Sequence, residues 1–590
     1  MASTDQRTRR SVPSWSRCGG CGVLQYAKKL ARNLGVCLDC GHHHRLRAAE
    51  RIEQLVDAGS FAPLDISVTA TDPLRFTDSQ PYPARLAKAQ AATGLDDAVL
   101  AGTARIDGQP LAIAAMDFAF MGGSLGEAVG EMLTLTVESA LRRSLPFLVV
   151  TASGGARMQE GVIALMQMAK VSQALASMRA AGLLTISVIT DPTYGGVAAS
   201  YATTCDVVVA EHGARMGFAG PRVIEQTVRQ KLPEGFQTAS FLLAHGQVDA
   251  VLKRADLRGW LAQLLTATVG PARPRPAGTR PPAAPSGRGS PTSRATIVTD
   301  PDLLSDLDPG QVVAAARDTA RPTTLDYLAG AFSGFAELHG DRIGMDCPSV
   351  VAGFATLAGR PVAVVGHQKG HTTRELVARN FGMPVPAGYR KALRVMQLAA
   401  RVKLPIVTIV DTPGAYPGTD AEEQGQARAI AENLVAMFEL ATPIVTVITG
   451  EGGSGGALAL AVADRVLMLE RATYSVISPE GCSAILWGNA RYAAEAARAL
   501  RITAREQLAL GVVDGVLPEP RGGAAADPAM MMAALAAAVD DLLTDLSGLD
   551  SAALVQARRS RFRAFGTSAP LVDAGLAGVD AGLAGTAAGR

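Results

Sequence analysis

One pattern of strand, glycine turn and helix occurs twice in this sequence, and the repeat limits the fold more than any other feature. The apolar run 183–190 precedes a glycine pair at Gly195, and the apolar run 443–449 precedes a glycine pair at Gly455. In each copy, another apolar run followed by glycine lies about 40 residues upstream. Apolar strands that alternate with helices favour an α/β fold with largely parallel strands. We therefore expect a duplicated domain with two related sites that face each other.

A segment rich in proline and arginine separates the two copies. Residues 271–295 contain seven Pro, five Arg and no acidic residue, a composition typical of an extended linker. A small-residue repeat near the C-terminus indicates a disordered tail. The expected division is a disordered N-terminus at 1–13, a zinc ribbon at 14–60, a first α/β domain at 61–270, the linker at 271–295, a second α/β domain at 296–545 and the disordered tail at 546–590.

Composition excludes several classes of protein. Apolar residues make up 48% of the chain and charged residues 19%, which is enough to build a packed core. The formal net charge of +2 favours neither a nucleic acid nor a membrane as partner. No run of 18 uncharged apolar residues occurs, and the N-terminus has no apolar signal segment, so we expect a cytoplasmic protein. In that compartment the seven Cys are metal ligands or core thiols rather than disulfides.

Four cysteines near the N-terminus have the spacing of a zinc ribbon. Two Cys-x2-Cys pairs, 15 residues apart, together supply four thiolates to a closed tetrahedral site. Because such a site has no open coordination position, one Zn²⁺ bound there is structural. The following residues, His42 to His44, either extend the metal site or form a solvated run. The expected ligands are Cys18, Cys21, Cys37 and Cys40, and the expected core thiols are Cys205, Cys347 and Cys482.

The two glycine pairs suit the stabilisation of negative charge on a carbonyl oxygen. The start of a helix leaves backbone N–H groups unpaired, and glycine lets a ligand approach the main chain. Such a turn can donate hydrogen bonds to an oxyanion, although close packing of a helix against a strand also explains a glycine pair. Ser454 lies in a G-x-S-x-G string, but no His follows His371, so we reject a hydrolase triad. The candidate site consists of the backbone amides of Gly195, Gly196, Gly455 and Gly456.

Several longer strings are more specific than any glycine pair. Those of the first half are Met116–Ser124, Ser153–Gly161 and Gly217–Gln226, and those of the second half are Glu337–Arg342, Gly366–Gly370, Asn380–Pro384, Asp411–Gly418, Gly450–Ala457 and Tyr474–Cys482. With the four cysteines, the first set resembles the β subunit of the carboxyltransferase of bacterial acetyl-CoA carboxylase. The second set resembles the α subunit of that enzyme. The chain looks like a β–α fusion, with the resemblance covering about residues 14–265 and 320–520.

The resemblance implies a fold, a reaction and partners. Each half would be a crotonase-like carboxyltransferase domain, built as a ββα superhelix. The implied reaction transfers a carboxyl group from carboxybiotin to acetyl-CoA and gives malonyl-CoA for fatty acid biosynthesis. Biotin would arrive on a biotin carboxyl carrier protein, charged by a separate ATP-dependent biotin carboxylase, since the chain contains no Met-Lys biotinylation motif. A homodimer of the fused chain would correspond to the family's α2β2 assembly.

The resemblance also assigns roles to the glycine pairs. The amides at Gly195 and Gly196 would hold the thioester oxygen of the acyl-CoA as an enolate forms. Those at Gly455 and Gly456 would hold the ureido oxygen of biotin. No side-chain base is then needed, because the ureido nitrogen can accept the proton, and backbone dipoles stabilise both oxygens without reorganising.

Other residues near the turns have less defined roles. His367 and Lys369 are candidates for contacts with the phosphates of CoA. Arg157 and Glu160 either orient a substrate or form a structural ion pair. Tyr194 stands where the family often has Thr, which leaves the acyl group open.

Three alternatives stay open. Propionyl-CoA or another acyl-CoA could replace acetyl-CoA as the acceptor. A crotonase-type hydratase or isomerase would need an acid/base pair, and none is recognisable beside either glycine turn. A regulator of another class would bind nucleic acid through the ribbon, since residues 1–60 carry ten Lys or Arg against five Asp or Glu.

Overall fold

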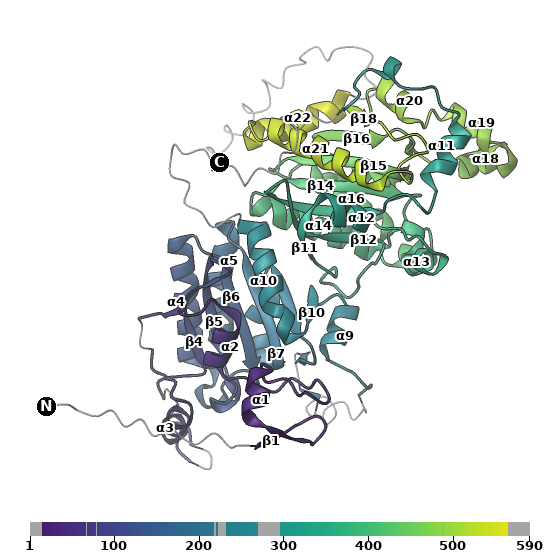
Figure 1. Cartoon of the computed structure of the whole chain (residues 1–590). Coiled ribbons are helices and arrows are strands. Elements are labelled where there is room, and N and C mark those ends of the chain that lie inside the picture. The colour runs from purple at the N-terminus through teal and green to yellow at the C-terminus, as the bar shows by residue number, and fades with distance from the viewer. Residues whose placement is uncertain are drawn as a thin grey trace, which may run out of the picture.

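The computed structural model describes residues 15–65, 68–72, 74–77, 80–217, 220–221, 232–269, 296–487 and 489–564 (Figure 1). The expected disordered N-terminus at 1–13 and the expected linker at 271–295 lie outside these residues. Each half of the chain builds its own sheet, and helices cover both sheets. Within the described ranges, no helix is both long and apolar enough to cross a membrane.

The first half contains an eight-stranded sheet in the order β10-β8-β7-β6-β5-β4-β3, with β9 paired to β7. Strands β4 and β5 are antiparallel, whereas β5, β6, β7, β8 and β10 run parallel to their neighbours. Every residue of β6 is buried, as expected for a parallel strand covered on both faces. The strands are β3 Ala62–Pro63, β4 Val99–Ile106, β5 Gln109–Met116, β6 Phe147–Ser153, β7 Thr185–Tyr194, β8 Val207–Glu211, β9 Met216–Gly217 and β10 Ala250–Leu252.

The second half repeats this plan in the order β11-β12-β13-β14-β15-β16-β18, with β17 paired to β15. Strand β12 is antiparallel to both β11 and β13, and the sheet is parallel from β13 to β18. The strands are β11 Ser333–Glu337, β12 Val350–Leu357, β13 Arg360–His367, β14 Ile406–Thr412, β15 Ile444–Gly453, β16 Arg465–Leu469, β17 Thr473–Ser475 and β18 Gly515–Leu517.

The strand register confirms the expected duplication. In the first sheet Ser153 pairs with Thr193 just after an irregularity, and in the second sheet Thr412 pairs with Gly452 after the same irregularity. Both members of the second pair lie 259 residues after their counterparts in the first. The strands that carry the two glycine turns are therefore equivalent in three dimensions.

Helices form the outer layers. Alternate residues of β6 enter two different cores: Phe147 packs with helices α4 and α5, and Leu148 packs with α2 and α10. Helix α10 also packs on β11, β12 and β13, so one apolar core joins the two halves. In the first half the helices are α2 Ala48–Leu55, α3 Tyr82–Thr93, α4 Glu127–Arg143, α5 Val162–Ala180, α6 Gly195–Ala198, α7 Tyr201–Thr204, α9 Ala239–Ala244 and α10 Arg254–Val269.

The second half has a similar helical cover. The amphipathic helix α14 packs its buried face against β12, β13 and β14. The helices are α11 Pro309–Ala316, α12 Thr324–Ala331, α13 Thr373–Ala378, α14 Pro386–Arg401, α15 Thr419–Glu423, α16 Gln426–Met437, α17 Ser454–Leu458, α18 Pro479–Trp487, α19 Ala493–Ala499, α20 Ala504–Ala509, α21 Pro528–Leu546 and α22 Ser551–Ala564. The 3-10 turns of the chain are η1 Met121–Gly123, η2 Met158–Glu160, η3 Pro301–Leu303, η4 Asn380–Gly382 and η5 Ala490–Tyr492.

The small N-terminal module lies beside the first half. It consists of the hairpin β1 Trp15–Arg17 and β2 Leu24–Tyr26, followed by helix α1 Ala27–Arg32. In Figure 1 it sits at the end of the first sheet to which β7 points.

The C-terminus corrects one expectation. We expected a disordered tail at 546–590, but residues 551–564 form helix α22. Leu554 and Arg558 of this helix are buried, and Arg558 is enclosed by partners from the second half. The tail expectation is therefore wrong for this segment, because buried contacts order residues whose composition alone suggested disorder. Residues 565–590 lie outside the described part of the chain.

Candidate functional site

The first glycine turn joins β7 to the short helix α6. Gly195 begins α6 with a φ of +59°, a conformation that a side chain would strain. The glycine turn that follows β6 packs directly against it, since a Cβ atom built at Gly155 would lie 3.5 Å from the Cα of Gly195. Because Gly195 and Gly196 start a helix, their N–H groups have no acceptor within that helix. Two glycine turns thus meet where backbone donors are available.

The second turn has the same construction between β15 and α17. Strand β15 ends at Gly453, and α17 begins at Ser454, whose φ is +62°. A Cβ atom at Gly456 would collide with the backbone of Gly414 and Ala415 in the turn after β14. Glycine at 456 is therefore required for the two segments to approach each other.

The structure pairs the two turns one residue differently from the sequence pattern. The positive-φ positions Gly195 and Ser454 are 259 residues apart, the same offset as in the strand pairs before them, whereas the sequence pattern pairs Gly195 with Gly455. Gly195 and Gly196 therefore correspond to Ser454 and Gly455, and α17 is one residue longer than α6 at its C-terminal end. Sequence reasoning also left Gly155 and Gly414 out of the site. The sequence could have indicated them, because each of these two glycines follows the upstream apolar run of its copy of the repeat.

The immediate surroundings of each glycine turn come from its own half of the chain. The nearest side chains to a Cβ atom at Gly196 are Met168 and Ala156, both in the first half. At Gly455 the near neighbour is Ile430, in the second half. The expectation that the two sites face each other stays a prediction.

Ion pairs hold the strand ends that carry the second turn. The Nζ atom of Lys369 lies 2.7 Å from Oδ1 of Asp411 and 2.8 Å from Oε2 of Glu451. Asp411 also accepts a hydrogen bond from the backbone N–H of Glu451, at 2.9 Å. Burial lowers the pKa of Lys369, but the two carboxylates outweigh that effect and raise it above its ordinary value. Sequence reasoning missed this pairing of Asp411 and Glu451, because nothing local in the sequence links them to Lys369.

His367 and Lys369 do not have the surroundings expected of CoA contacts. His367 is fully buried at the end of β13, and its burial, together with the positive charge of Lys369, lowers its pKa to about 3. His367 is enclosed by the protein, and Lys369 is already paired with two carboxylates. These surroundings do not favour contacts with CoA, which stay a prediction.

Arg157 and Glu160 form a structural ion pair. The Arg157 guanidinium donates to Oδ1 of Asp97 at 2.5 Å and to Oε1 of Glu160 at 3.2 Å, and it is fully buried. Glu160 also accepts a hydrogen bond from the Tyr82 hydroxyl. With these partners, neither charge is free to orient a substrate, so the structural alternative is the correct one.

The four expected zinc ligands come together. Their ligand atoms all lie within 4.8 Å of one another, with Sγ–Sγ distances of 3.6 Å between Cys18 and Cys40 and 3.8 Å between Cys21 and Cys37. Four thiolates bound at the usual zinc–sulfur distance form a tetrahedron with edges of about 3.8 Å. This donor set therefore fits one Zn²⁺, which would tie together the two turns of the ribbon. The other three cysteines, Cys205, Cys347 and Cys482, are buried as expected.

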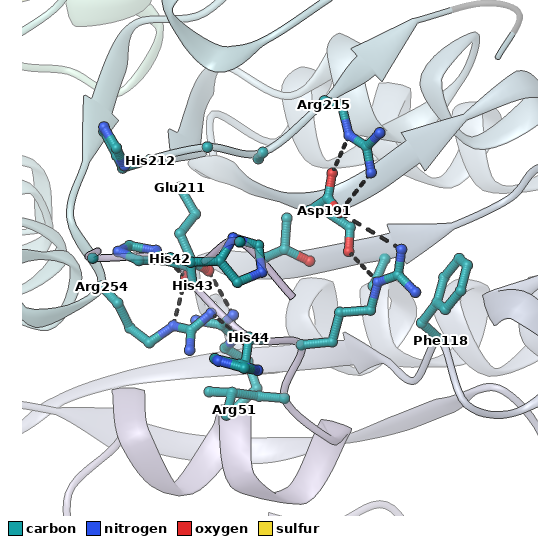
Figure 2. Close-up of a pocket in the computed structure, with 18 of the residues that line it drawn as sticks. His42, His43, His44, Arg51, Phe118, Asp191, Glu211, His212, Arg215 and Arg254 are labelled. Atoms are coloured by element: carbon teal, nitrogen blue, oxygen red, sulfur yellow. Dashed lines mark hydrogen bonds and ion pairs between the residues drawn. The ribbon is translucent and has the colours of Figure 1, made fainter. Parts of the chain in front are cut away.

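The histidines after the ribbon line a cavity, with His42 exposed and His43 and His44 partly buried. A cavity of about 440 Å³ lies between the ribbon and the ends of β5, β6, β7 and β8. Figure 2 shows His42, His43 and His44 around it, together with Asp191 and with Glu211 beside His43. These histidines are not among the metal ligands of the described chain.

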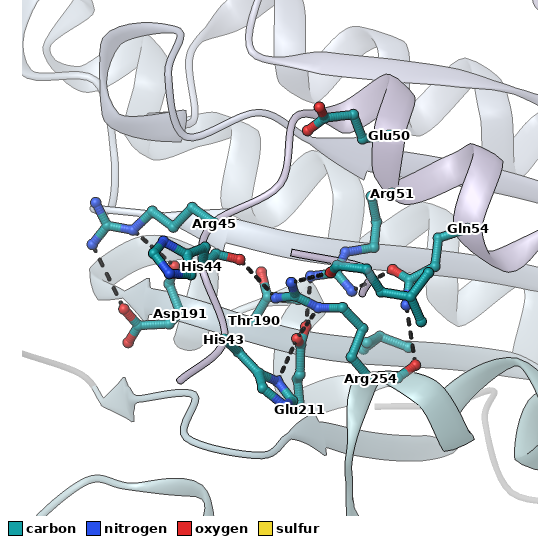
Figure 3. A network of polar contacts seen from close by, with 12 residues as sticks. His43, His44, Arg45, Glu50, Arg51, Gln54, Thr190, Asp191, Glu211 and Arg254 are labelled. Atoms are coloured by element: carbon teal, nitrogen blue, oxygen red, sulfur yellow. Dashed lines mark hydrogen bonds and ion pairs between the residues drawn. The ribbon is translucent and has the colours of Figure 1, made fainter. Parts of the chain in front are cut away.

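A buried carboxylate anchors the ribbon to the first sheet. Glu211, at the end of β8, accepts a hydrogen bond from Nδ1 of His43 at 2.7 Å and pairs with Arg51 and Arg254, each at 2.5 Å (Figure 3). Burial raises the pKa of Glu211, but the His43 hydrogen bond and the two arginines lower it to about 2. Arg254 also donates to the carbonyl of Leu34 in the ribbon. The zinc ribbon, which forms one wall of the cavity, is therefore held in place by charge-assisted hydrogen bonds.

The other side of this cavity lies close to the first glycine turn. Asp191, near the end of β7, pairs with Arg215 at 2.8 Å and with Arg45 at 3.6 Å, and Arg45 stacks on the ring of Phe118. Tyr194, three residues further, precedes the turn directly. Four arginines and two carboxylates line the cavity, which leaves two positive charges in excess. The arrangement can attract an anionic ligand to the approach of the first turn.

Comparisons with known proteins identify the family. A relative from Salinispora arenicola (strain CNS-205), the acetyl-coenzyme A carboxylase carboxyl transferase subunits beta/alpha, is 60% identical over 95% of this chain and 98% of its own length. The chain belongs to this carboxyl transferase family. A more distant member from Clostridium tetani (strain Massachusetts / E88) is 42% identical over 94% of this chain and 93% of its own. The fused order of the carboxyl transferase halves is therefore that of its relatives.

Models of two carboxylase families match parts of the chain. Residues 15–40 match the acetyl-CoA carboxylase zinc finger domain, and residues 294–566 match the family described as acetyl co-enzyme A carboxylase carboxyltransferase-like. The first match contains all four cysteines, which agrees with a structural zinc site.

Solved structures support the fold. The crystal structure of transcarboxylase 12S superposes with a TM-score of 0.64 at 23% identity, and covers 88% of this chain and 92% of its own. A single-chain, multi-domain long-chain acyl-CoA carboxylase gives a TM-score of 0.62 at 19% identity, over 88% of this chain and 47% of its own. The carboxyl transferase chain thus has two crotonase-like α/β domains behind a four-cysteine ribbon, as expected.

Proposed function

We propose that this chain is the carboxyltransferase component of an acetyl-CoA carboxylase. It transfers a carboxyl group from carboxybiotin, carried on a separate protein, to acetyl-CoA and forms malonyl-CoA. The observation that carries the proposal is the 60% identity, over nearly the whole chain, to a relative with that name. The duplicated glycine turns supply what this chemistry needs, because each presents backbone donors at the start of a helix.

In this proposal the first turn binds the acyl group. The N–H groups of Gly195 and Gly196 donate hydrogen bonds to the thioester oxygen, which becomes more negative as the proton leaves the neighbouring carbon. Fixed backbone donors favour that charge without rearrangement, and the loss of one such donor costs about 10²–10³ in kcat. Gly155 keeps side-chain atoms away from the approach to this turn.

The second turn holds the carboxyl donor. The N–H groups of Gly455 and Gly456 donate to the ureido oxygen, and the Lys369 ion pairs keep the ends of β14 and β15 in register behind them. When bound, carboxybiotin supplies the carboxyl group and a ureido nitrogen that takes the proton. With these roles, the reaction needs no side-chain acid or base beside either turn.

The cavity beneath the zinc ribbon receives the acyl-CoA in this proposal. A CoA thioester carries several phosphate charges, and the cavity has two positive charges in excess close to Tyr194 and the first turn. This replaces His367 and Lys369 as the source of CoA contacts. One Zn²⁺, bound by the four cysteines, keeps the zinc ribbon folded over this cavity.

The partners follow from the reaction. A biotin carboxyl carrier protein brings the carboxyl group, and a separate ATP-dependent biotin carboxylase recharges it. A homodimer supplies a complete site, with the first turn of one chain opposite the second turn of the other. The separate surroundings of the two turns within one chain support this arrangement.

The reverse reaction tests the proposal. Purified chain, given malonyl-CoA and biocytin, should release acetyl-CoA, and a methylmalonyl-CoA arm measures the acyl preference. Arg215→Gln should raise KM for malonyl-CoA with little change in kcat, because Arg215 lines the cavity away from the reacting atoms. If no acetyl-CoA is released with either biocytin or a carrier protein as acceptor, the proposed function is wrong.

A further inference from the structure

A second cavity, of about 670 Å³, lies where the two halves meet. Helix α5 and the end of α7 form one wall, and helix α14 with the loop around Arg342 forms the other. It is separate from the cavity beneath the ribbon, and the two share no lining residue. Neither glycine turn lines it.

Arginines from both halves dominate the lining. Arg179 comes from the first half, and Arg342, Arg394 and Arg401 come from the second. Asp206 is the one carboxylate among the described lining residues. It pairs with Arg401 at 2.5 Å and lies 3.8 Å from Arg179.

A second carboxylate, behind the lining, balances part of this charge. Asp249 is fully buried, pairs with Arg394 at 2.8 Å and also pairs with Arg342. Four guanidinium groups therefore share two carboxylates, and two positive charges remain. Burial lowers the pKa of Arg342, and the positive charge of Arg394 lowers it further against the opposing effect of Asp249.

Several guanidinium donors in this cluster have no acceptor. The Nε atom of Arg342 and the Nε and Nη1 atoms of Arg394 are buried and make no hydrogen bond in the described structure. Buried donors on charged groups are normally satisfied, because leaving one unpaired costs about 1–3 kcal/mol or more. An oxyanion in the cavity would supply the missing negative charge to the guanidinium groups that line it.

We propose that this cavity binds a small anion with at least two phosphoryl groups, such as a free diphosphate or a nucleoside diphosphate. Arginine forks suit phosphate oxygens, and several arginines around one space favour more than one phosphate. The hydroxyl group of Ser172, also in the lining, adds a neutral donor. Because the arginines come from both halves, a bound anion would stabilise the interface between the two domains that carry the glycine turns.

Two variants change the cavity without breaking a buried ion pair. Arg179→Gln removes the most exposed arginine, whose side chain is 60% exposed and lies 3.8 Å from its carboxylate. Thr204→Glu places a carboxylate among the exposed lining residues, where it would supply the negative charge that the arginines lack and repel an anion. Arg559→Gln, on the exposed face of α22, is the matched loss of one positive charge elsewhere.

Calorimetric titration and thermal unfolding of the full chain with pyrophosphate test the proposal. We expect pyrophosphate to bind the wild-type chain and raise its thermal midpoint beyond the effect of potassium chloride at equal ionic strength. Arg179→Gln should weaken binding by about tenfold, Thr204→Glu should abolish it, and Arg559→Gln should leave it unchanged. Tighter binding of ADP than of pyrophosphate would identify a nucleotide as ligand, and equal binding would identify the diphosphate group alone.

Two results would overturn the proposal. One is wild-type affinity for pyrophosphate in Thr204→Glu. The other is loss of binding in Arg215→Gln, beneath the ribbon, while Thr204→Glu still binds. The measurement does not use carboxyl transfer, so its failure leaves the proposed function untouched, and failure of the reverse assay leaves this binding result untouched.

Discussion

At Gly456 the missing side chain is a condition for building the second turn. The backbone of Gly414 and Ala415 occupies the space that a Cβ atom would take. Gly344 offers a contrast, since nothing lies within 4 Å of a Cβ atom there. Two glycines can thus have different structural roles, and only the packing around each one shows which role it has.

The Gly456→Ala variant should show this requirement in kinetics. The added methyl displaces α17 from the turn after β14, so we expect kcat of the reverse reaction to fall by about 10²–10³, the loss expected when an oxyanion donor moves out of place. KM for malonyl-CoA should change little, because the acyl site lies in the other half. Gly344→Ala is the control and should behave as wild type. A Gly456→Ala enzyme with normal kcat would remove this turn from the mechanism.

His367 makes the stability of the chain depend on pH. Its pKa is about 3 in the folded chain, against an ordinary value of 6.5, because burial disfavours the charged ring. Between these two pH values the unfolded chain binds a proton that the folded chain does not. The stability linked to His367 is therefore present above pH 6.5 and declines as the pH falls, by about 1.4 kcal/mol per pH unit.

Thermal midpoints between pH 7.5 and pH 5 measure this linkage. His367→Leu stays neutral throughout, so its midpoint should fall less steeply with decreasing pH than that of the wild type. His245→Leu, which replaces an exposed imidazole, is the control and should keep the wild-type slope. Equal slopes in all three proteins would show that His367 is not buried and neutral in the folded chain.

Among the elements, helix α22 shows how one side chain can attach a segment. Arg558 pairs with Asp464 at 2.7 Å and donates to the backbone carbonyls of Met437, Leu440 and Thr442. Both charged side chains are buried. Composition suggested a disordered tail here, because the contacts that order the helix come from residues about 100 positions earlier.

Arg558→Met should therefore destabilise the second half. It leaves Asp464 buried without its partner, a change that costs about 3–5 kcal/mol. We expect the thermal midpoint to fall by roughly 6–10 °C. Arg559→Met, at the exposed next position, should keep the wild-type midpoint in differential scanning calorimetry. If both variants unfold at the same temperature, α22 is not anchored as described.

For the whole molecule, the arrangement of the two turns decides how many chains make one site. Apolar side chains remain exposed beside the first turn: Met158, Leu165 and Met166 have exposed fractions of 79%, 51% and 50%. A second chain that covered them would bring its own second half close to this turn. The proposed homodimer thus explains the exposed apolar surface.

Mixing two defective chains tests that arrangement. Gly196→Val fills the first turn, and Gly455→Val fills the second, where a Cβ atom meets only Ile430 at 3.9 Å. Each variant alone should be inactive in the reverse assay. If sites form between chains, equal mixtures that are allowed to exchange subunits should recover about a quarter of wild-type activity, because half the dimers are mixed and each has one intact site. No recovery, with mixed dimers demonstrated, would place both turns of a site in one chain.

The repeat, the cysteine spacing and the longer strings in the sequence predicted two α/β domains, the zinc ligands and the positions of both glycine turns. These features are local, since strand periodicity, ligand spacing and turn residues each occupy a short window of chain. The surroundings of His367, the Lys369 ion pairs, the burial of Arg558 and the arginine cavity between the halves could not be predicted in this way. They depend on which distant segments pack together, because burial and the nearest opposite charge set how a polar side chain behaves, and the folded chain alone supplies both.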